Sequence, residues 1–323
     1  MPKAIRFHET GGPSVLRLED IAVGAPGAGE ARVRHTAIGV NFIDVYHRSG
    51  LYPLPLPSGV GVDAAGVVEA VGAGVTHVRP GDRVGYVASA GTYAEERVVP
   101  ADRLVKLPVD VPDRTAAAMM LKGLTVRALV RRTYRVQAGD PVLVHAAAGG
   151  VGLLMTQWLK ALGATVIATV GSDEKAKIVR AHGADHAIVY TREDFPKRVR
   201  EITGGEGVAV AYDSVGKATF EGSLDSLRPL GLMVTFGNAS GPPPLLDVGV
   251  LGRKGSLFLT RPTIFSYIAR REDLEQAAAE VFEIVRSGKV KVEVSRTWPL
   301  AQAAEAHRAL EGRQTTGSLV LLP

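Results

Sequence analysis

The pattern of apolar and polar positions changes near residue 141 of the chain. Before this point, short segments that alternate or run apolar are separated by turns rich in glycine and proline. Such segments predict the strands of a coiled, mainly antiparallel, β-rich domain. The predicted strands are Ala31–Ile38, Ala65–Val71, Arg83–Tyr86 and Glu95–Val99.

From residue 141 onward, a short apolar run is followed by a segment with helical spacing, and this unit repeats several times. The alternation predicts a parallel sheet covered by helices on both faces, so we expect an α/β protein with a doubly wound Rossmann sheet. The predicted strands are Pro141–His145, Thr165–Val170, Ala187–Tyr190, Val208–Asp213, Leu232–Phe236 and Leu257–Thr260, and the predicted helices are Val151–Leu162, Glu174–Ala181, Pro196–Ile202 and Phe220–Leu227.

The tail of the chain predicts two further helices, Asp273–Ser287 and Ala301–Glu311, and two strands, Glu293–Trp298 and Ser318–Leu322. We expect this tail to pack against the first domain, which would make the Rossmann domain an insertion. The expected domains are therefore residues 1–122 together with 266–323, and residues 123–265 between them.

The stretch His145-Ala-Ala-Ala-Gly149-Gly150-Val151-Gly152 follows a predicted strand and opens a predicted helix. In this context a glycine-rich turn binds the pyrophosphate of a dinucleotide. A side chain at Gly149 would hold the backbone away from the phosphates, and one at Gly152 would hold the helix away from the strand. Ala147 stands at the first glycine position of this fingerprint. The alternative is a tight turn without a nucleotide, but the number of further strands favours dinucleotide binding.

The end of the second Rossmann strand indicates which dinucleotide is bound. NAD sites usually place Asp or Glu there to hold the ribose 2′-hydroxyl, whereas this chain has Gly171 and Ser172, with Lys175 shortly after. A hydroxyl and an ammonium suit the 2′-phosphate of NADPH, and Tyr190 at the end of the third strand offers another hydroxyl. The acidic pair Asp173-Glu174 weakens this argument unless both carboxylates face solvent, and Lys175 is alternatively an exposed helix lysine.

The composition excludes several function classes. The 323 residues include no cysteine, which excludes disulfides, thiol catalysis and thiolate zinc sites. The 8 histidines lack metal-binding spacing, and we expect them at the surface or in turns. The formal charge is +5, but the basic residues are dispersed, which argues against nucleic acid as the main ligand. No apolar run reaches the ~18 residues of a membrane span, and the first residues lack a signal core, so we expect a cytoplasmic protein.

A series of motifs resembles one family over nearly the whole chain. These motifs are KAIRFHETGGPSVL, AIGVNFIDVYHRSGLYP, Gly61–Gly66, GDRV, LKGLT, HAAAGGVG, AYDSVGK, GLMVTFGNASG, GSLFLTRP and the closing GSLVLLP. They resemble the quinone oxidoreductases of the zeta-crystallin type, in the zinc-independent branch of the medium-chain dehydrogenase/reductase superfamily. The resemblance implies a GroES-like catalytic domain formed by both chain ends, a Rossmann domain between them, and a homodimer joined through the edge strand Leu257–Thr260.

The departures from the zinc-using alcohol dehydrogenases of that superfamily concern the metal ligands. Those relatives have G-H-E-x-x-G, whose histidine binds zinc, whereas this chain has Val62 in Gly61–Gly66 and no thiolate near Asn41-Phe42. With no ligand set, the hydride acceptor must already be electron-poor, as a quinone or an α,β-unsaturated carbonyl is. We expect NADPH-dependent quinone reduction without a metal, either by hydride or by single electrons to a semiquinone.

The resemblance also implies the residues near the substrate. Asn41, Asp44 and Tyr46 are expected near the nicotinamide and its ribose, and Tyr52 is a candidate for contact with the substrate. The alternatives are a turn-forming amide for Asn41 and a helix-terminal carboxylate for Asp44. Either tyrosine would bind a carbonyl oxygen or stack on a ring, or else is an ordinary half-buried tyrosine. The sequence identifies no proton donor.

Further positions are expected to contact the cofactor. Three of them have structural alternatives: Thr125 as a helix-start cap, Asn238 as a turn residue before Gly241, and Arg313 as a solvent-facing arginine. The expected cofactor contacts, from the glycine turn, the strand ends and the resemblance together, are Asn41, Thr125, Gly149, Gly150, Val151, Gly171, Ser172, Lys175, Tyr190, Ser214, Phe236, Gly237, Asn238, Phe258, Thr260 and Arg313.

Two other functions stay open at this point. One is the NADPH-dependent reduction of an alkenal or enone double bond on the same scaffold, because the shape of the substrate pocket decides between the two reactions. The other is a non-enzymatic role, binding RNA or acting as a crystallin, which the resemblance to zeta-crystallin brings into view.

Overall fold

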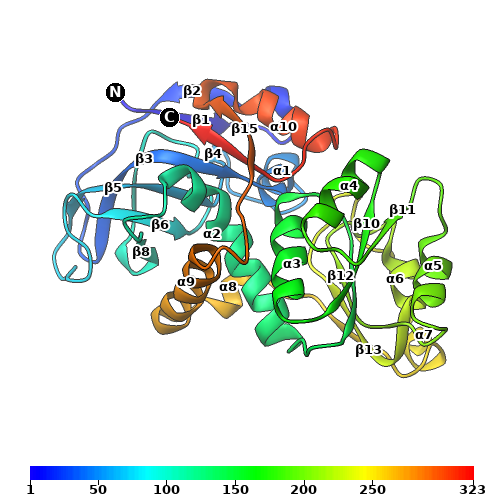
Figure 1. Cartoon of the computed structure of the whole chain (residues 1–323). Coiled ribbons are helices and arrows are strands. Elements are labelled where there is room, and N and C mark those ends of the chain that lie inside the picture. The colour runs from blue at the N-terminus through cyan, green and yellow to red at the C-terminus, as the bar shows by residue number, and fades with distance from the viewer. The chain divides into compact units, whose positions relative to one another are not determined.

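The computed structural model describes residues 1–323, which form two compact units. The first contains Met1–Leu124, Arg270–Phe282 and Val292–Pro323, and the second contains Thr125–Ala269 and Glu283–Lys291. Both chain ends therefore belong to the first unit, as the blue and red segments in Figure 1 show. None of the helices has the length and apolar character needed to cross a bilayer.

The first unit is built on two sheets. The larger has the strand order β15-β16-β3-β5-β6-β8, with β7 also paired to β3, and the smaller has the order β2-β1-β4. All pairs are antiparallel except β15 with β16. The strands are β1 (Lys3–Phe7), β2 (Arg17–Asp20), β3 (Glu30–Val40), β4 (Ser58–Gly59), β5 (Asp63–Val71), β6 (Arg83–Val87), β7 (Glu96–Pro100), β8 (Leu104–Lys106), β15 (Val294–Pro299) and β16 (Ser318–Leu322).

The alternating strands of this unit enclose its core. In β3, Ala31 and Val33 are buried while Arg32 and Arg34 point outward and pair with Glu69, which is the period of a strand with one covered face. The pairing of β16 with β3 carries the end of the chain into this unit, whereas Glu283–Lys291, within the tail expected in the first domain, belong to the second unit. The helices here are α1 (Phe42–Ser49), α10 (Ala303–Glu311) and most of α2 (Asp113–Ala128) and α9 (Arg271–Arg286), and the short 3-10 turns are Pro13–Val15, Ala101–Arg103 and Leu300–Gln302.

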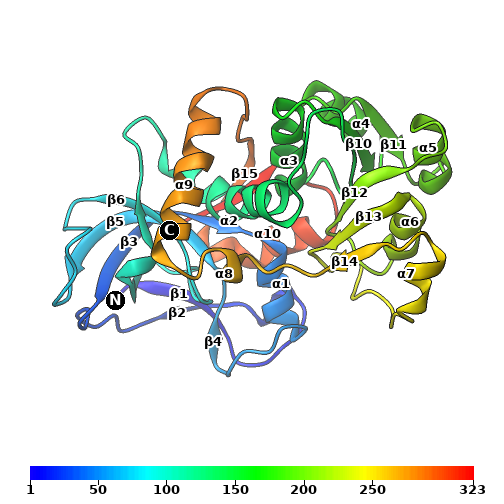
Figure 2. The ribbon, with the colours of Figure 1, turned by 90° about the horizontal axis from the view of Figure 1, so that it is seen from below.

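The second unit is a six-stranded parallel sheet in the order β11-β10-β9-β12-β13-β14, so the predicted fold class is confirmed. In Figure 1, α3 and α4 lie on one side of this sheet and α5 and α6 on the other. The strand β14 borders the sheet (Figure 2). The elements are β9 (Pro141–Val144), α3 (Gly150–Ala161), β10 (Thr165–Val170), α4 (Asp173–Ala181), β11 (His186–Val189), α5 (Phe195–Ile202), β12 (Val208–Asp213), α6 (Phe220–Asp225), β13 (Leu227–Thr235), α7 (Gly249–Arg253), β14 (Phe258–Thr260) and α8 (Ile264–Tyr267), together with a π-helical turn at Leu129–Thr133.

The structure differs from the sequence prediction at a few elements. β13 begins at Leu227, five residues before the predicted Leu232, so the preceding helix ends at Asp225. The sequence pattern also missed α1 and α2. Buried side chains surround most of α2, so it lacks the polar stripe that makes a helix visible in a sequence.

Candidate active site

The predicted glycine turn joins β9 to α3 in the second unit. Gly149 precedes the helix, and its N–H donates to the carbonyl oxygen of Ala146 at 2.9 Å. A Cβ atom added at Gly152 would lie 2.5 Å from the Ala146 carbonyl oxygen and 2.6 Å from that of Ala147. The first turn of α3 therefore packs directly on the backbone behind it, and a turn of this kind fits the pyrophosphate of a dinucleotide.

The backbone conformation of the turn explains why alanine can replace the first glycine of the fingerprint. The left-handed conformation of this turn falls on Ala146, with φ at 50°, while the fully buried Ala147 is not among the residues with positive φ. Ala146 holds a conformation that costs free energy for any residue with a Cβ. The turn thus stores backbone strain one residue before the position where the fingerprint has its first glycine.

The end of β10 brings together the residues predicted for nucleotide selection. Ser172 caps α4, because its hydroxyl oxygen accepts the Lys175 N–H at 3.3 Å. A Cβ atom added at Gly171 would lie 3.0 Å from the Tyr190 hydroxyl, so that hydroxyl lies beside the strand end. No carboxylate ends β10 itself, and the first acidic side chain belongs to Asp173 in α4.

Asp173 is held in an ion pair that the sequence analysis missed. Arg192 donates to both carboxylate oxygens of Asp173, at 2.5 and 2.6 Å, and this pairing lowers the pKa of the carboxyl. The pair leaves little net negative charge from Asp173 near Ser172 and Lys175. The separation of 19 residues between the partners gives no sequence signal, because only the fold brings the start of α4 next to the loop after β11.

Buried polar side chains support the turn after β12, which carries Ser214. Asp213 accepts the N–H groups of Val215 and Gly216 with one oxygen and the hydroxyls of Thr219 and Ser223 with the other. Since every bond to this carboxylate comes from the following turn and helix, Asp213 fixes the backbone that carries Ser214.

His145 extends this network across the sheet. Its ring contacts the hydroxyls of Thr169 at 2.8 Å and Ser223 at 2.9 Å, and burial lowers the pKa of the imidazole. The prediction that the histidines lie at the surface or in turns is wrong for His145 and also for His35 and His307, which are buried. Each of the three hydrogen-bonds to a buried partner, and such pairing leaves no mark in a sequence.

The turns that follow β12 and β13 are in contact with each other. A Cβ atom at Gly237 would collide with the Ser214 carbonyl oxygen, so a glycine is needed where these turns meet. Asn238 begins a turn closed by the Gly241 N–H, which donates to its carbonyl oxygen at 2.9 Å. Phe236 and Thr260 are half-buried, whereas Phe258 is 60% exposed on the edge strand β14.

In the first unit, Asn41 and Asp44 form the start of α1. The Asn41 backbone N–H donates to Asp44 Oδ2 at 2.8 Å, and the Asn41 amide nitrogen donates to Asp63 Oδ1 at 2.7 Å. Asp44 Oδ2 also accepts the Tyr93 hydroxyl at 2.9 Å. Complete burial, followed by the nearby Asp63, raises the pKa of Asp44 to about 8. Asp44 is therefore mostly protonated at neutral pH.

Tyr46 and Tyr52 lie together beyond this helix start. Their ring centroids are 5.2 Å apart in an edge-to-face arrangement, and the Tyr52 N–H donates to the Tyr46 carbonyl oxygen at 3.0 Å. Tyr46 is buried and Tyr52 is half-buried. The structure thus brings these two predicted residues together on one side of α1.

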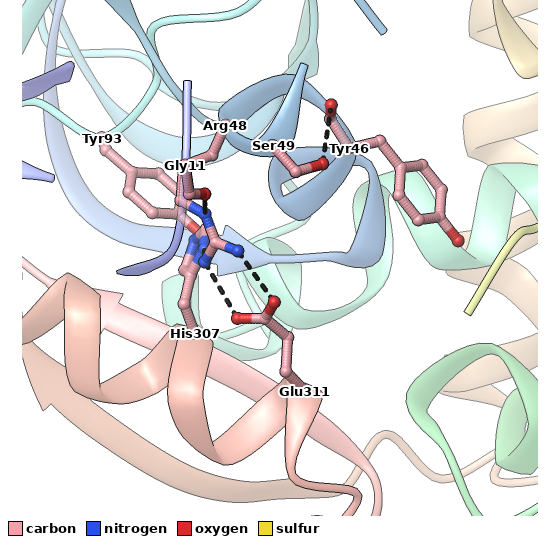
Figure 3. A network of polar contacts seen from close by, with 7 residues as sticks. All are labelled: Gly11, Tyr46, Arg48, Ser49, Tyr93, His307 and Glu311. Atoms are coloured by element: carbon pink, nitrogen blue, oxygen red, sulfur yellow. Dashed lines mark hydrogen bonds and ion pairs between the residues drawn. The ribbon is translucent and has the colours of Figure 1, made fainter. Parts of the chain in front are cut away.

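A polar network joins α1 to α10 on the opposite side (Figure 3). Arg48 donates to both Glu311 oxygens, at 2.9 and 2.8 Å, and to the Gly11 carbonyl oxygen at 3.0 Å. Its guanidinium also donates to His307 Nδ1 at 3.1 Å, and His307 Nε2 lies 3.2 Å from the Tyr93 hydroxyl. Figure 3 shows Tyr46 pointing away from this cluster. The network ties the helix that carries Asp44 to a segment 263 residues later in the chain.

Two further predicted residues have definite places. Thr125 lies in the last turn of α2, which begins at Asp113, so its alternative role as a helix-start cap is wrong. Arg313 follows α10 in the first unit, is exposed and has φ at 56°.

The residues of this chain do not fit a zinc ion. Val62, at the position of the zinc-binding histidine of related dehydrogenases, is an apolar buried residue. The chain has no cysteine, and no three His, Asp or Glu side chains converge into a set that would hold a metal.

A GroES-like domain joined to a Rossmann domain is the architecture of the medium-chain dehydrogenases and reductases. Residues 27–109 match the family model described as the alcohol dehydrogenase GroES-like domain, and residues 150–283 match the zinc-binding dehydrogenase model. The chain is 51% identical to a quinone oxidoreductase of Pseudomonas aeruginosa and 47% identical to a 2-haloacrylate reductase of Burkholderia. Both matches cover all of this chain, with 100% of the first relative and 99% of the second.

A solved structure supports the same grouping. The Escherichia coli quinone oxidoreductase complexed with NADPH superimposes with a TM-score of 0.98 and 49% identity, over 99% of this chain and 100% of that one. The chain therefore belongs to the zinc-independent quinone oxidoreductase family of the medium-chain superfamily. The prediction that it is an oxidoreductase enzyme is confirmed.

Proposed function

We propose that this chain reduces quinones with NADPH and without a metal ion. The proposal rests on two observations taken together. The glycine turn after β9 is tight, and the segment after β10 contains Ser172 with no carboxylate before it. The NADPH-complexed relative supports the same nucleotide, and the quinone oxidoreductases at about half identity support the substrate class. When bound, NADPH supplies the reducing equivalents, and the protein supplies binding, orientation and exclusion of water.

The phosphates of the nucleotide are assigned to the second unit. The backbone of Gly149, Gly150 and Val151 at the start of α3 holds the pyrophosphate, since free N–H groups and the helix dipole both favour an anion there. The 2′-phosphate is held by Gly171, Ser172, Lys175 and Tyr190.

The nicotinamide and the substrate are assigned to further groups. The strand ends around the nicotinamide are provided by residues of the second unit, namely Thr125, Ser214, Phe236, Gly237, Asn238, Phe258 and Thr260. Asn41, Asp44, Tyr46 and Tyr52 orient the quinone. A protonated Asp44 keeps a negative charge away from an acceptor that becomes negative during reduction.

Substitution of Lys175 tests the assignment of the 2′-phosphate. Lys175→Ala is expected to raise the KM for NADPH by about tenfold, the effect of ~1.4 kcal/mol of lost charge-assisted bonding. The KM for NADH should change less than twofold, because NADH has no 2′-phosphate. Steady-state kinetics with both nucleotides measure this difference, and Lys177→Ala on the same helix is the matched control. Equal changes for the two nucleotides would refute the assignment.

Substitution of Asp44 tests its protonation state. The pKa of about 8 exceeds the ordinary value of 3.8, so the unfolded chain loses this proton at a lower pH than the folded chain. The free energy of unfolding should therefore fall as pH rises from about 4 to about 8, by up to ~1.4 kcal/mol per pH unit. Asp44→Asn removes this contribution, so the variant gains stability relative to wild type as pH rises.

Urea unfolding at pH 5, 6.5 and 8.5 measures this gain, with the exposed Asp20→Asn as the control. Curves for wild type and Asp44→Asn that stay parallel over this range would contradict a raised pKa at Asp44.

A second candidate reaction is reduction of a carbon–carbon double bond conjugated to a carbonyl or carboxylate. It is favoured by the 47% identity to the 2-haloacrylate reductase. Turnover with 1,4-benzoquinone and phenanthrenequinone, compared with an alkenal and 2-chloroacrylate, distinguishes the reactions. Higher kcat/KM for the quinones is expected, and turnover of only the alkenal or haloacrylate would replace quinone reduction as the function.

The proposal includes a homodimer in the cytoplasm. β14 has a free edge in the parallel sheet and exposes Phe258, and pairing with a second copy would cover both. Size-exclusion chromatography with light scattering should give twice the mass of 34.1 kDa, and a stable monomer would contradict the dimer.

A further inference from the structure

Two buried charged residues in the first unit have no role in the account so far. Asp63 opens β5 and is fully buried, and Lys122 in α2 is 6% exposed. Burying a charge costs several kcal/mol unless other groups compensate it. Side chains of this kind are retained where they hold something in place, so the groups that they contact identify what is held.

The carboxylate of Asp63 is bonded on both oxygens. Oδ1 accepts the amide nitrogen of Asn41 at 2.7 Å, and Oδ2 accepts the Leu121 N–H at 3.1 Å. A side chain at Gly39 would collide with this carboxylate, so the approach of Asp63 to Asn41 depends on a glycine in β3. Asp63 thus connects the N-cap of α1 to the backbone of α2.

These bonds fix which way the Asn41 amide points. The amide nitrogen faces Asp63 Oδ1, so the amide oxygen faces away from that side chain. The backbone N–H of Asn41 is held separately by Asp44. Asn41 is therefore restrained at two atoms. Its side-chain oxygen faces the Asp44 backbone N–H in a capping box, and an amide oxygen has a second lone pair that a bound ligand can use.

Lys122 compensates the charge of this arrangement. Its ammonium donates to the Val40 carbonyl oxygen at 3.3 Å, directly before Asn41 in the chain. Burial lowers the pKa of Lys122, and the nearby Asp63 offsets part of that shift. Burial raises the pKa of Asp63, whereas Lys122 and the two N–H donors lower it. Burial outweighs these groups, so the pKa of Asp63 stays above its usual range, and the ammonium and the N–H donors offset part of that cost.

We propose that Asp63, supported by Lys122, is a positioning residue that holds the Asn41 amide in one orientation with its oxygen toward the ligand. The proposal rests on the proposed function, in which Asn41 orients the substrate. Asp63 itself touches neither, and it acts only through Asn41.

The first test needs no cofactor or substrate. In the nucleotide-free protein, the side-chain amide resonances of Asn41 are assigned by their loss in Asn41→Ala. Asp63→Asn leaves one acceptor oxygen for two N–H donors, and Asp63→Asn with Lys122→Met removes both ionisable groups without leaving an uncompensated ammonium. Both variants are expected to shift these resonances and speed their exchange with water. Resonances that stay unchanged would overturn the proposal.

The second test is a double-mutant cycle on quinone turnover. Asp63→Asn is expected to lower kcat about tenfold in the wild-type background and less than twofold in Asn41→Ala, because its effect passes through Asn41. Asp113→Asn serves as the control, because Asp113 is a hydrogen-bonded carboxylate at the start of α2 that does not contact Asn41. This variant is expected to have a lower Tm and little change in kcat. Equal losses from Asp63→Asn in both backgrounds would overturn the proposal. Absence of quinone turnover in the wild type would refute only the proposed function, since the resonance test stands without it.

Discussion

Gly152→Val is expected to abolish measurable NADPH binding, with a Kd at least about 100-fold higher than that of the wild type. The added side chain would begin 2.5 Å from the Ala146 carbonyl oxygen, so α3 must move away from the turn behind it. The N–H groups at the start of α3 then no longer converge on the pyrophosphate. Overpacking of this kind also costs about 1–3 kcal/mol of stability. Fluorescence titration with NADPH, together with thermal unfolding, measures both effects.

A matched control separates this effect from a general effect of adding a side chain to a helical glycine. A Cβ atom at Gly252, in α7, would meet nothing within 4 Å, so Gly252→Ala should bind NADPH like the wild type. Gly149→Ala lies between the two, because its Cβ would stand 3.3 Å from the Ala146 carbonyl oxygen. Wild-type affinity in Gly152→Val would show that the glycine turn does not bind the nucleotide.

Arg48→Met is expected to lower the free energy of unfolding by about 3 kcal/mol, since it removes a buried guanidinium and its charge-assisted hydrogen bonds, although the partner Glu311 is partly exposed. The guanidinium of Arg48 is 2% exposed and bonds Glu311, His307 and the Gly11 carbonyl oxygen. Methionine fills a similar volume but cannot donate a hydrogen bond to any of these three groups. Chemical denaturation measures the change.

Arg79→Met is the control for this prediction. Arg79 is 85% exposed and 3.8 Å from Asp82, and an exposed pair of this kind contributes less than about 1 kcal/mol. Equal losses in the two variants would mean that the network in Figure 3 does not stabilise the first unit.

The Rossmann half of the fold was predictable because its elements leave clear local signals. β12 is buried on both faces and therefore appears as an unbroken apolar run, and α3 ends near Gly163, where the chain turns. α2 gave no such signal, because it is covered on most sides. Local patterns thus predict an element well when it is a short unbroken apolar run, when one face of it meets water, or when its ends carry glycine.

The candidate site was predictable to the same limited degree. The glycine turn and the missing carboxylate at Ser172 lie within short stretches of sequence. Asp63 and Arg192, by contrast, act on residues 22 and 19 positions away. Hydrogen bonds across such separations depend on strand order and helix packing, which a single sequence does not encode locally.

Oxidation of NADPH by 1,4-benzoquinone, followed by absorbance after dialysis against a chelator, tests the central claim most directly. The account predicts undiminished turnover with NADPH, lower kcat/KM with NADH, and no gain on adding Zn²⁺. Turnover that disappears on dialysis and returns only with Zn²⁺ would contradict it.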